Sequence, residues 1–454
     1  MPEVPVKMYL DKLLKDCRKA ASALPLLPGP LKDRALAAMA DRITAEGEAI
    51  LSANERDVDS LGKTLEGEPS KDRLKAAVAR VRIKADDIKD MADRLRIIAD
   101  LPDPVGAVTA RWERPDGLQV SRVRVPIGVI GIISELKPIV TVESIGLCLK
   151  SGNLAVFRGS PEWTWTHQAI GKAMRAAADE HGVPAGSWAL IERPEKDVAL
   201  ELIRAAKALD AIIPRGGAGL KKTVLEGARM PVLCHDAGLT YLYVDGDTNI
   251  PMGQNLVINS KAQLAGAANA IDTLLVQQVV ARPFLPALIN RLLDEFKVEV
   301  RGCPKTIALM GQMAMTGHTS IKPASEEDWR TQFQGPVLAV KMVADMEEAL
   351  AHIASHGPCL AAVIATTSYQ SAMRFTREVD AGTVLVNASS RLNAGDGLGF
   401  GTDIGLSGSR LHAKGPIGLE QLTCEKYVVF GNGQLRLPHP VPEAYFDAIM
   451  LKRP

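Results

Sequence analysis

The sequence lacks an excess of charge of either sign and has no long hydrophobic run. Lysine and arginine total 54 against 53 aspartates and glutamates, so there is no basic field of the kind that attracts nucleic acid or anionic lipid. The longest apolar stretches, such as residues 125–133, fall far short of the roughly 20 residues that span a bilayer, and residues 1–15 lack the apolar core of a signal peptide. We therefore expect a cytoplasmic protein with no nucleic-acid partner and no membrane partner.

Cysteine is also scarce. The six cysteines are scattered over 454 residues with no CxxC pair, which argues against a disulfide framework or a zinc ribbon and predicts free thiols. The eight histidines show no HExxH motif and no paired spacing, so no metal site is predicted. The chain does have 46% hydrophobic and 24% charged residues, which is enough for a large core shared by two or three lobes.

The order of the predicted elements indicates an α/β fold. The first hundred residues place apolar side chains such as Leu36, Met39 and Ile43 at helical spacing. From residue 129 onward, short apolar strands alternate with amphipathic helices, and a second alternating set starts at residue 273. This alternation predicts two doubly wound parallel-sheet lobes. The helices expected in them include 163–181, 197–207 and 284–296.

Two β-hairpins are predicted outside these lobes. A Pro-Asp-Gly turn separates strand-like runs in residues 109–125, and Gly431-Asn432-Gly433 separates KYVVF from QLRL near the C-terminus. Because lone hairpins are only marginally stable in water, we expect them to pair with a sheet edge of another subunit.

A glycine run in residues 211–222 follows an apolar strand and opens a helix. Glycine allows the backbone to approach a pyrophosphate closely, and a helix N-terminus presents free N–H groups to it. The run does not match GxGxxG, and a glycine-rich turn of this kind is often only a turn. Spacing alone therefore leaves both alternatives open for Gly216, Gly217 and Gly219.

Six longer motifs occur in a fixed order along almost the whole chain. They are RVPIGVIGII (124–133), LCLKSGNLAVFRGSPE (147–162), GVPAGSW (182–188), IIPRGGAGL (212–220), NASSR (387–391) and LHAKGPIGLE (411–420). In these motifs the chain resembles the gamma-glutamyl phosphate reductases of the aldehyde dehydrogenase superfamily.

The resemblance implies an aldehyde-dehydrogenase-like fold with an oligomerisation flap of β-hairpins. The expected divisions are a cofactor-binding lobe at 1–108 and 126–257, a catalytic-type lobe at 258–417, flap hairpins at 109–125 and 418–438, and a tail at 439–454. The family forms homo-oligomers, so a dimer or a tetramer is expected.

The family's reaction is the NADPH-dependent reduction of L-glutamate 5-phosphate to L-glutamate 5-semialdehyde in proline biosynthesis. By resemblance, Gly216, Gly217 and Gly219 would meet the cofactor and Arg158 would lie near its ribose. A thiolate attacks the acyl phosphate, phosphate leaves, and hydride reduces the resulting thioester. An asparagine side chain and the nucleophile's backbone N–H hold the oxyanion.

This sequence departs from the family's chemistry at several positions. The segment INSKAQLAGAANAIDTLLV (258–276) matches the family's cysteine-bearing segment, but Ala268 stands at the cysteine position. Ile139 stands at the position of the oxyanion asparagine, after Pro138. Gln332 stands where many aldehyde dehydrogenases have a glutamate that holds a cofactor ribose, and an amide can still bond a hydroxyl.

Other residues of the matching motifs suggest a pocket for a small acidic ligand. Arg391 could bind a carboxylate with both guanidinium nitrogens or form a plain surface ion pair. The match to the family favours the pocket, together with Asn269, Asn387 and Ser389.

Three functions therefore remain in view. The chain could be a reductase homologue that has lost thioester chemistry, since losing both a nucleophile and an oxyanion donor would cripple the reaction. It could be an active dehydrogenase with a relocated thiol such as Cys234, although Cys234 and His235 would point to opposite faces of a strand. It could also be a structural or regulatory assembly partner.

Overall fold

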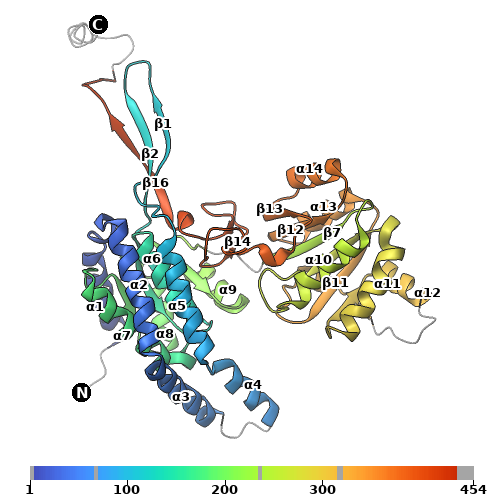
Figure 1. The fold of residues 1–454 in the computed structure, drawn as a ribbon, viewed down its shortest axis with the longest axis horizontal. Coiled ribbons are helices and arrows are strands. Elements are labelled where there is room, and N and C mark those ends of the chain that lie inside the picture. The colour runs from blue at the N-terminus through green and yellow to red at the C-terminus, as the bar shows by residue number, and fades with distance from the viewer. Residues whose placement is uncertain (1–4, 66–69, 234–237, 314–320, 437–454) are drawn as a thin grey trace.

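The computed structural model describes residues 5–65, 70–233, 238–313 and 321–436. The first hundred residues form a layer of helices beside the first sheet (Figure 1). Three residues predicted to face the core, Leu36, Met39 and Ile43, are fully buried there. The helices are α1 (Val6–Ala20), α2 (Gly29–Ala45), α3 (Gly47–Thr64), α4 (Lys71–Val81) and α5 (Ala85–Asp100).

The first lobe contains a four-stranded parallel sheet in the order β5-β4-β3-β6. Its strands are β3 (Val129–Ser134), β4 (Leu154–Arg158), β5 (Trp188–Leu190) and β6 (Ala211–Arg215). They are apolar along most of their length because helices cover the sheet on both faces. The connecting helices are α6 (Ile139–Lys150), α7 (Thr164–Glu180), α8 (Lys196–Leu202) and α9 (Ala218–Gly227).

The second lobe contains a seven-stranded parallel sheet in the order β10-β9-β11-β8-β7-β12-β13. Its strands are β7 (Leu239–Val244), β8 (Thr273–Gln277), β9 (Glu299–Gly302), β10 (Lys322–Pro323), β11 (Val337–Val343), β12 (Cys359–Ala365) and β13 (Ala381–Val386). The helices are α10 (Ile250–Ala262), α11 (Gln278–Asp294), α12 (Pro304–Met313), α13 (Met346–Ser355) and α14 (Tyr369–Glu378).

The lobe boundary predicted at residue 257 is wrong. Strand β7 pairs in parallel with β8 and β12, so it belongs to the second lobe. Helix α10, which follows β7, packs against α11 of the same lobe. The chain therefore passes from the first sheet to the second between α9 and β7.

A three-stranded antiparallel sheet projects from the body of the molecule (Figure 1). It consists of β1 (Val108–Glu113), β2 (Gln119–Pro126) and β16 (Thr423–Phe430), and we call it the flap. The first predicted hairpin is present as β1 and β2. A shorter ladder, β14 (Leu406–Ser407) with β15 (Gly415–Pro416), follows the second lobe in sequence, and Figure 1 shows β14 between the two lobes.

The second predicted hairpin is not formed by the described residues. Strand β16 pairs with β2 over eight residues instead of turning back on QLRL. Residues 434–436 are not in a strand, and Leu437 lies outside the described ranges. The Gln434 side chain instead donates to the Asp116 carbonyl at 2.8 Å, which ties this end of the chain to the β1–β2 turn.

No helix within the described ranges is long and apolar enough to cross a membrane. Among the same residues, no group of three or more histidine, cysteine, aspartate and glutamate side chains is arranged to hold a metal ion.

One buried histidine predicts how stability responds to acid. Burial, with a smaller contribution from the charge of Arg158, lowers the pKa of His167 to about 4, and its Nδ1 lies 2.9 Å from Thr141 Oγ1. In the unfolded chain the imidazole of His167 takes up a proton near pH 6.5, whereas in the folded protein it does so only near pH 4. The contribution of His167 to the free energy of unfolding is therefore present in full above about pH 6.5 and is lost as the pH falls toward 4. The lost free energy of unfolding is about 3 kcal/mol.

Urea unfolding between pH 7 and pH 4 would measure this effect. His167→Gln keeps an acceptor for Thr141 but does not titrate, so its stability should fall less steeply with acid. An identical pH dependence in both proteins would contradict the assignment.

Candidate functional site

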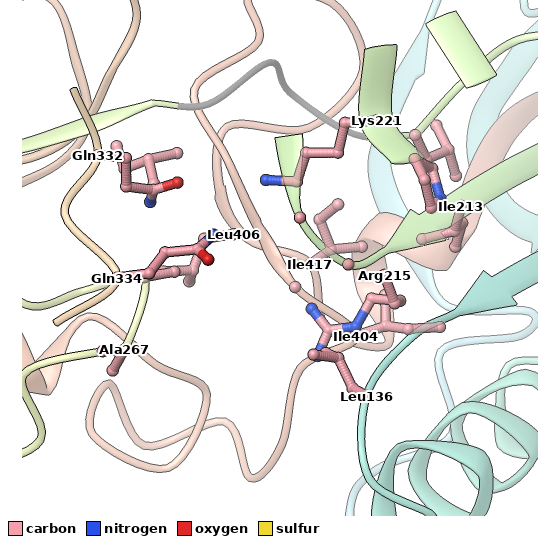
Figure 2. Close-up of a pocket in the computed structure, with 18 of the residues that line it drawn as sticks. Leu136, Ile213, Arg215, Lys221, Ala267, Gln332, Gln334, Ile404, Leu406 and Ile417 are labelled. Atoms are coloured by element: carbon pink, nitrogen blue, oxygen red, sulfur yellow. The ribbon is translucent and has the colours of Figure 1, made fainter. Parts of the chain in front are cut away.

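A cleft of about 420 Å³ opens between the two lobes (Figure 2). One wall comes from β6, the turn after it and α9, and the other from the loop after α10 and the segment before β11. Arg215 and Lys221 lie on the first side, and Ala267, Gln332 and Gln334 face them from the second. The cleft thus brings the glycine run together with residues 266–268 and 332–334 from later in the sequence.

The glycine run forms part of this wall. Gly216 and Gly217 line the cleft, and Gly217 is the N-cap of α9. None of Gly216, Gly217 and Gly219 lies in the left-handed backbone region, so the turn itself does not demand glycine. A Cβ at Gly217 or Gly219 would meet nothing within 4 Å, which leaves open space for a ligand to approach the backbone.

Gly216 differs from its neighbours because it is crowded. A Cβ there would lie 2.5 Å from Glu135 Oε2 and 2.8 Å from Leu220 Cδ2. The same Glu135 oxygen accepts a hydrogen bond from the Gly217 N–H at 3.2 Å. A carboxylate of the chain itself therefore occupies the helix N-terminus, where the helix dipole favours negative charge.

The charged side chains that line the cleft are both cationic. They are Arg215 and Lys221, and no described carboxylate is among the lining residues. Glu143 lies behind Arg215 and contacts Arg94 at 3.3 Å, while Thr402 donates to it at 3.0 Å. Burial raises the pKa of Glu143, and the two arginines oppose that shift. The cleft is therefore suited to an anionic ligand.

Ala268 lines the cleft, as the match to the cysteine-bearing segment predicts for the nucleophile position. Its carbonyl accepts from Thr240 Oγ1 at 3.3 Å. Its N–H makes no hydrogen bond to any described residue.

Ile139, the second position predicted to depart from the family's chemistry, carries an apolar side chain. Ile139 is the first residue of α6, directly after the N-cap Pro138. It is partly buried and packs against the apolar core of the first lobe, and it is not among the residues that line the cleft.

Asn269, adjacent to Ala268, has its side chain engaged inside the protein. The amide donates to the carbonyls of Arg391 at 3.2 Å and Asn393 at 3.1 Å. The Ser390 hydroxyl donates to the Asn269 carbonyl at 2.6 Å. These bonds hold the NASSR motif against the segment that carries Ala268.

The remaining residues of the predicted ligand pocket lie on that motif. Ser389 is the N-cap of a short 3-10 helix, and its hydroxyl accepts from the Arg391 N–H at 3.2 Å. Asn387 has a positive φ of 53° and exchanges two hydrogen bonds with the backbone of Thr366. Arg391 donates through Nε to Gln263 Oε1 at 2.7 Å, and burial lowers its pKa. Arg391 is thereby held beside the loop that leads to Ala268.

The two further predicted cofactor residues lie in different surroundings. Gln332 lines the cleft, and its Nε2 is buried without a hydrogen-bond partner among the described residues. Arg158, at the end of β4, is outside the cleft lining and 7% exposed. It donates to the Pro194 carbonyl at 2.9 Å, and burial lowers its pKa against the opposing charges of Glu135 and Glu195.

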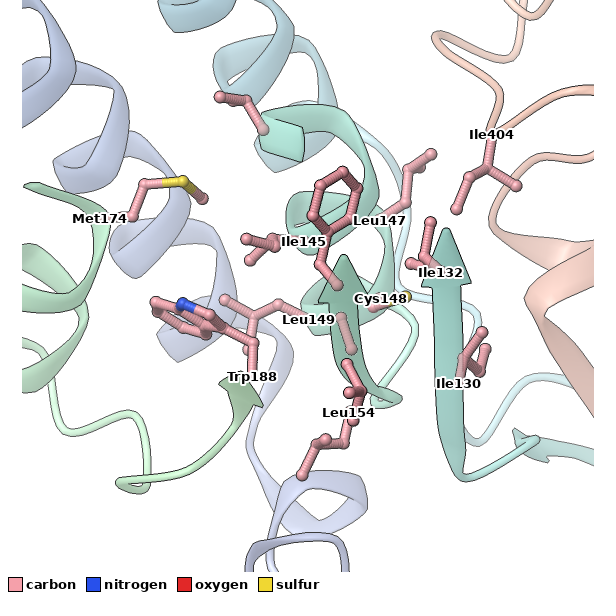
Figure 3. Packing of buried hydrophobic residues seen from close by; sticks show 14 of the residues in the cluster. Ile130, Ile132, Ile145, Leu147, Cys148, Leu149, Leu154, Met174, Trp188 and Ile404 are labelled. Atoms are coloured by element: carbon pink, nitrogen blue, oxygen red, sulfur yellow. The ribbon is translucent and has the colours of Figure 1, made fainter. Parts of the chain in front are cut away.

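No described cysteine lines the cleft. Cys17, Cys148, Cys303 and Cys359 are buried and Cys424 lies on the flap, and all five are free thiols as predicted. Burial raises the pKa of Cys148 to about 12, and Figure 3 shows its side chain among the apolar residues that form the core of the first lobe. Burial likewise raises the pKa of Cys17 to about 11. Neither is a reactive thiolate at neutral pH.

Cys234 lies outside the described residues. Leu233, directly before it, lines the cleft.

Lys261 and Asp272 form a buried pair behind the cleft that the sequence did not reveal. Burial lowers the pKa of Lys261 and raises that of Asp272, and each charge partly offsets the shift of the other. Asp272 accepts from the N–H groups of Thr240 at 3.0 Å and Phe333 at 2.8 Å. The Lys261 ammonium lies 5.9 Å from the Phe333 ring. The one sequence feature that could have indicated this pair is that Lys261 and Asp272 each lie next to an apolar residue.

The crowding at Gly216 gives a testable contrast. Gly216→Ala should push the Glu135 carboxylate away from the Gly217 N–H and lower the free energy of unfolding by about 1 kcal/mol. Gly217→Ala, which meets no neighbouring atom, should leave stability unchanged within about 0.5 kcal/mol. Denaturant unfolding of both variants would test this, and equal destabilisation would contradict it.

Comparisons with known proteins agree with this geometry. The aldehyde dehydrogenase family model matches residues 8–307 and 321–428. The gamma-glutamyl phosphate reductase of Moorella thermoacetica is 45% identical over 419 residues, covering 92% of this chain and 96% of that protein. That of Heliobacterium modesticaldum is 42% identical over 422 residues, covering 93% and 97%.

Solved structures agree as well. The crystal structure of gamma-glutamyl phosphate reductase from Thermotoga maritima matches with a TM-score of 0.86 and 36% identity, covering 94% of this chain and 99% of that one. An acetylating aldehyde dehydrogenase from Geobacillus thermoglucosidasius shares the fold with a TM-score of 0.66 at 17% identity, covering 95% and 98%. With its two parallel sheets and the cleft between them, the chain belongs to the gamma-glutamyl phosphate reductase family within the aldehyde dehydrogenases.

Proposed function

We propose that this chain is a gamma-glutamyl phosphate reductase homologue that keeps the ligand-binding cleft but no longer performs thioester chemistry. The observation that carries the proposal is the methyl group of Ala268 in the cleft, where the family has its nucleophilic thiol. Loss of a covalent nucleophile typically lowers turnover by roughly 10³ to 10⁶, and loss of an oxyanion donor by roughly 10² to 10³. Ile139 removes that donor as well.

The cofactor we expect in the cleft is NADPH. Three features support it: open space over Gly217 and Gly219, the cations Arg215 and Lys221, and the unpartnered amide of Gln332. The two cations would hold phosphates beside the glycine turn, where the Gly217 N–H is bonded to Glu135, and Gln332 would bond a ribose hydroxyl. NADPH supplies hydride in this family. In this proposal the first lobe holds the cofactor, with Arg158 near the ribose, and the second lobe holds the substrate.

A small acidic molecule is the expected second ligand. Arg391 is held beside the Ala268 loop by its bond to Gln263, with its remaining guanidinium nitrogens available to a carboxylate. Asn387, Ser389 and Asn269 fix the backbone around it through their own hydrogen bonds. These three residues therefore support the pocket, and Arg391 is the group we expect to touch the ligand.

A second candidate is an active dehydrogenase that uses Cys234. Its support is that the preceding residue, Leu233, lines the cleft. A thiol there would restore the missing nucleophile, while Ile139 would still leave the oxyanion with one donor fewer.

We also infer that the flap mediates homo-oligomer formation. Trp112, Tyr427 and Phe430 on it are 43%, 66% and 66% exposed, and Trp112 and Tyr427 pack edge to face. Apolar side chains on a projecting sheet favour coverage by another subunit. Strand β13 ends the seven-stranded sheet; β15 contacts it, but no described strand is hydrogen-bonded to this edge, so a partner's flap could add there.

Oligomer formation should depend on these side chains. Tyr427→Glu/Phe430→Glu should shift the protein from a dimer or tetramer to a monomer in analytical ultracentrifugation, because burying a carboxylate at an apolar interface is unfavourable. Val279→Glu is a matched control, since Val279 is 72% exposed near the start of α11, which packs against β8, β9 and β11 and is not on the flap. A monomeric parent protein would contradict the inference.

The loss of chemistry is tested by an NADP⁺-coupled assay with glutamate 5-semialdehyde and phosphate. The parent protein should show no turnover, while NADPH should raise its melting temperature because it binds the folded state. Robust turnover that Cys234→Ser abolishes would instead establish the second candidate.

Restoring the missing groups should restore the reaction. Ala268→Cys should give measurable turnover, and adding Ile139→Asn should raise it by about 10² to 10³. Ala267→Cys puts a thiol in the same cleft at the wrong residue and should stay inactive. If Ala268→Cys/Ile139→Asn binds NADPH yet remains inactive, the absence of a thiol at 268 and of an amide at 139 does not explain the lack of turnover.

A further inference from the structure

A second hollow lies on the first lobe, away from the cleft. It is a groove of about 650 Å³ between one face of α1 and the turn that follows α8, and it shares no lining residue with the cleft. Its lining residues are Lys7, Leu10, Asp11, Leu14, Lys15, Arg18, Glu201, Arg204, Ala205, Ala206, Lys207, Ala208 and Arg229. We call it the basic groove.

The charge of the basic groove is unlike that of the whole chain. Six lining residues are lysine or arginine and two are acidic, whereas lysine plus arginine exceed aspartate plus glutamate by one in the full sequence. Arg18 is neutralised by Asp210, to which its two terminal nitrogens donate at 2.9 and 2.8 Å. Arg204 lies 3.8 Å from Glu201, which is a loose pairing.

The other four cations are not paired within the described part of the chain. Lys7, Lys15, Lys207 and Arg229 are exposed and make no side-chain hydrogen bond or ion pair with any described residue. Lys7 and Lys15 lie on α1, and Lys207 and Arg229 lie on the opposite side of the groove. Concentrated like charge of this kind is unfavourable unless an anion offsets it.

The floor between these cations is apolar. Leu10 and Leu14 are 3% and 4% exposed, and Ala205 and Ala208 are partly buried beside them. The spacing from Lys7 to Arg18 along α1 corresponds to about 16 Å, which is longer than one phosphate group. The groove therefore suits an elongated ligand with an apolar, flat portion and more than one negative charge.

We propose that the basic groove binds a nucleoside polyphosphate. The base would lie on the leucine and alanine floor, and the phosphates would contact Lys15, Lys207 and Arg229. This site is independent of the function proposed for the cleft. The proposed event is reversible binding, in which no bond is made or broken.

Binding can be measured on the full chain by calorimetry at constant ionic strength, with ATP, AMP and inorganic triphosphate as probes. ATP should bind most tightly, because it alone combines a base with three phosphates. Lys15→Glu/Lys207→Glu should weaken ATP by about tenfold or more, since two charge-assisted contacts become repulsive. Lys12→Glu/Lys172→Glu is the control, because it reverses the charge of two exposed lysines that lie outside the groove. It should change the affinity for ATP less than about twofold.

Arg215→Met separates the groove from the cleft, where ATP could bind as a fragment of a dinucleotide. This substitution should lower the affinity for NADPH and leave the affinity for ATP unchanged. Three results would each overturn the proposal. They are loss of ATP binding in Arg215→Met, an equal loss of ATP affinity in the two double-lysine variants, and no binding of any probe at millimolar concentration. Equal affinity for ATP and inorganic triphosphate would overturn the nucleoside assignment.

Discussion

The buried side chain of Asn269 holds together the part of the molecule on which the cleft depends. Its amide joins the segment carrying Ala268 to the NASSR motif through the carbonyls of Arg391 and Asn393, and Ser390 bonds back to its carbonyl. None of these bonds uses the side chain at position 268. An alanine at position 268 is therefore compatible with this scaffold, because the bonds that hold it do not depend on that side chain.

The same separation of scaffold from chemistry holds across the cleft. Asp272 fixes both Thr240, which bonds the Ala268 carbonyl, and Phe333, which lies between two cleft glutamines. Arg215, on the opposite wall, is backed by the charge of Glu143. None of these contacts uses the side chain of Ala268.

Sequence periodicity predicted both parallel sheets and helices such as α7, expected at 163–181 and observed at Thr164–Glu180. It missed features that depend on long-range packing. Helix α11 begins at Gln278 and not at 284, because burial of its apolar face outweighs the prolines within it. Strand β16 pairs with β2, which lies about three hundred residues earlier. Resemblance located Ala268 in the cleft, but the Lys261–Asp272 pair emerges only when the elements pack.

The central claim is that no acyl intermediate can form in this cleft. It is tested most directly by intact-protein mass spectrometry after incubation with glutamate 5-semialdehyde and NADP⁺ in the absence of phosphate, the condition in which a thioester would accumulate. The account predicts an unchanged protein mass, and a matching adduct only in the Ala268→Cys variant. A hydroxylamine-labile acyl adduct on any cysteine of the parent protein would contradict it.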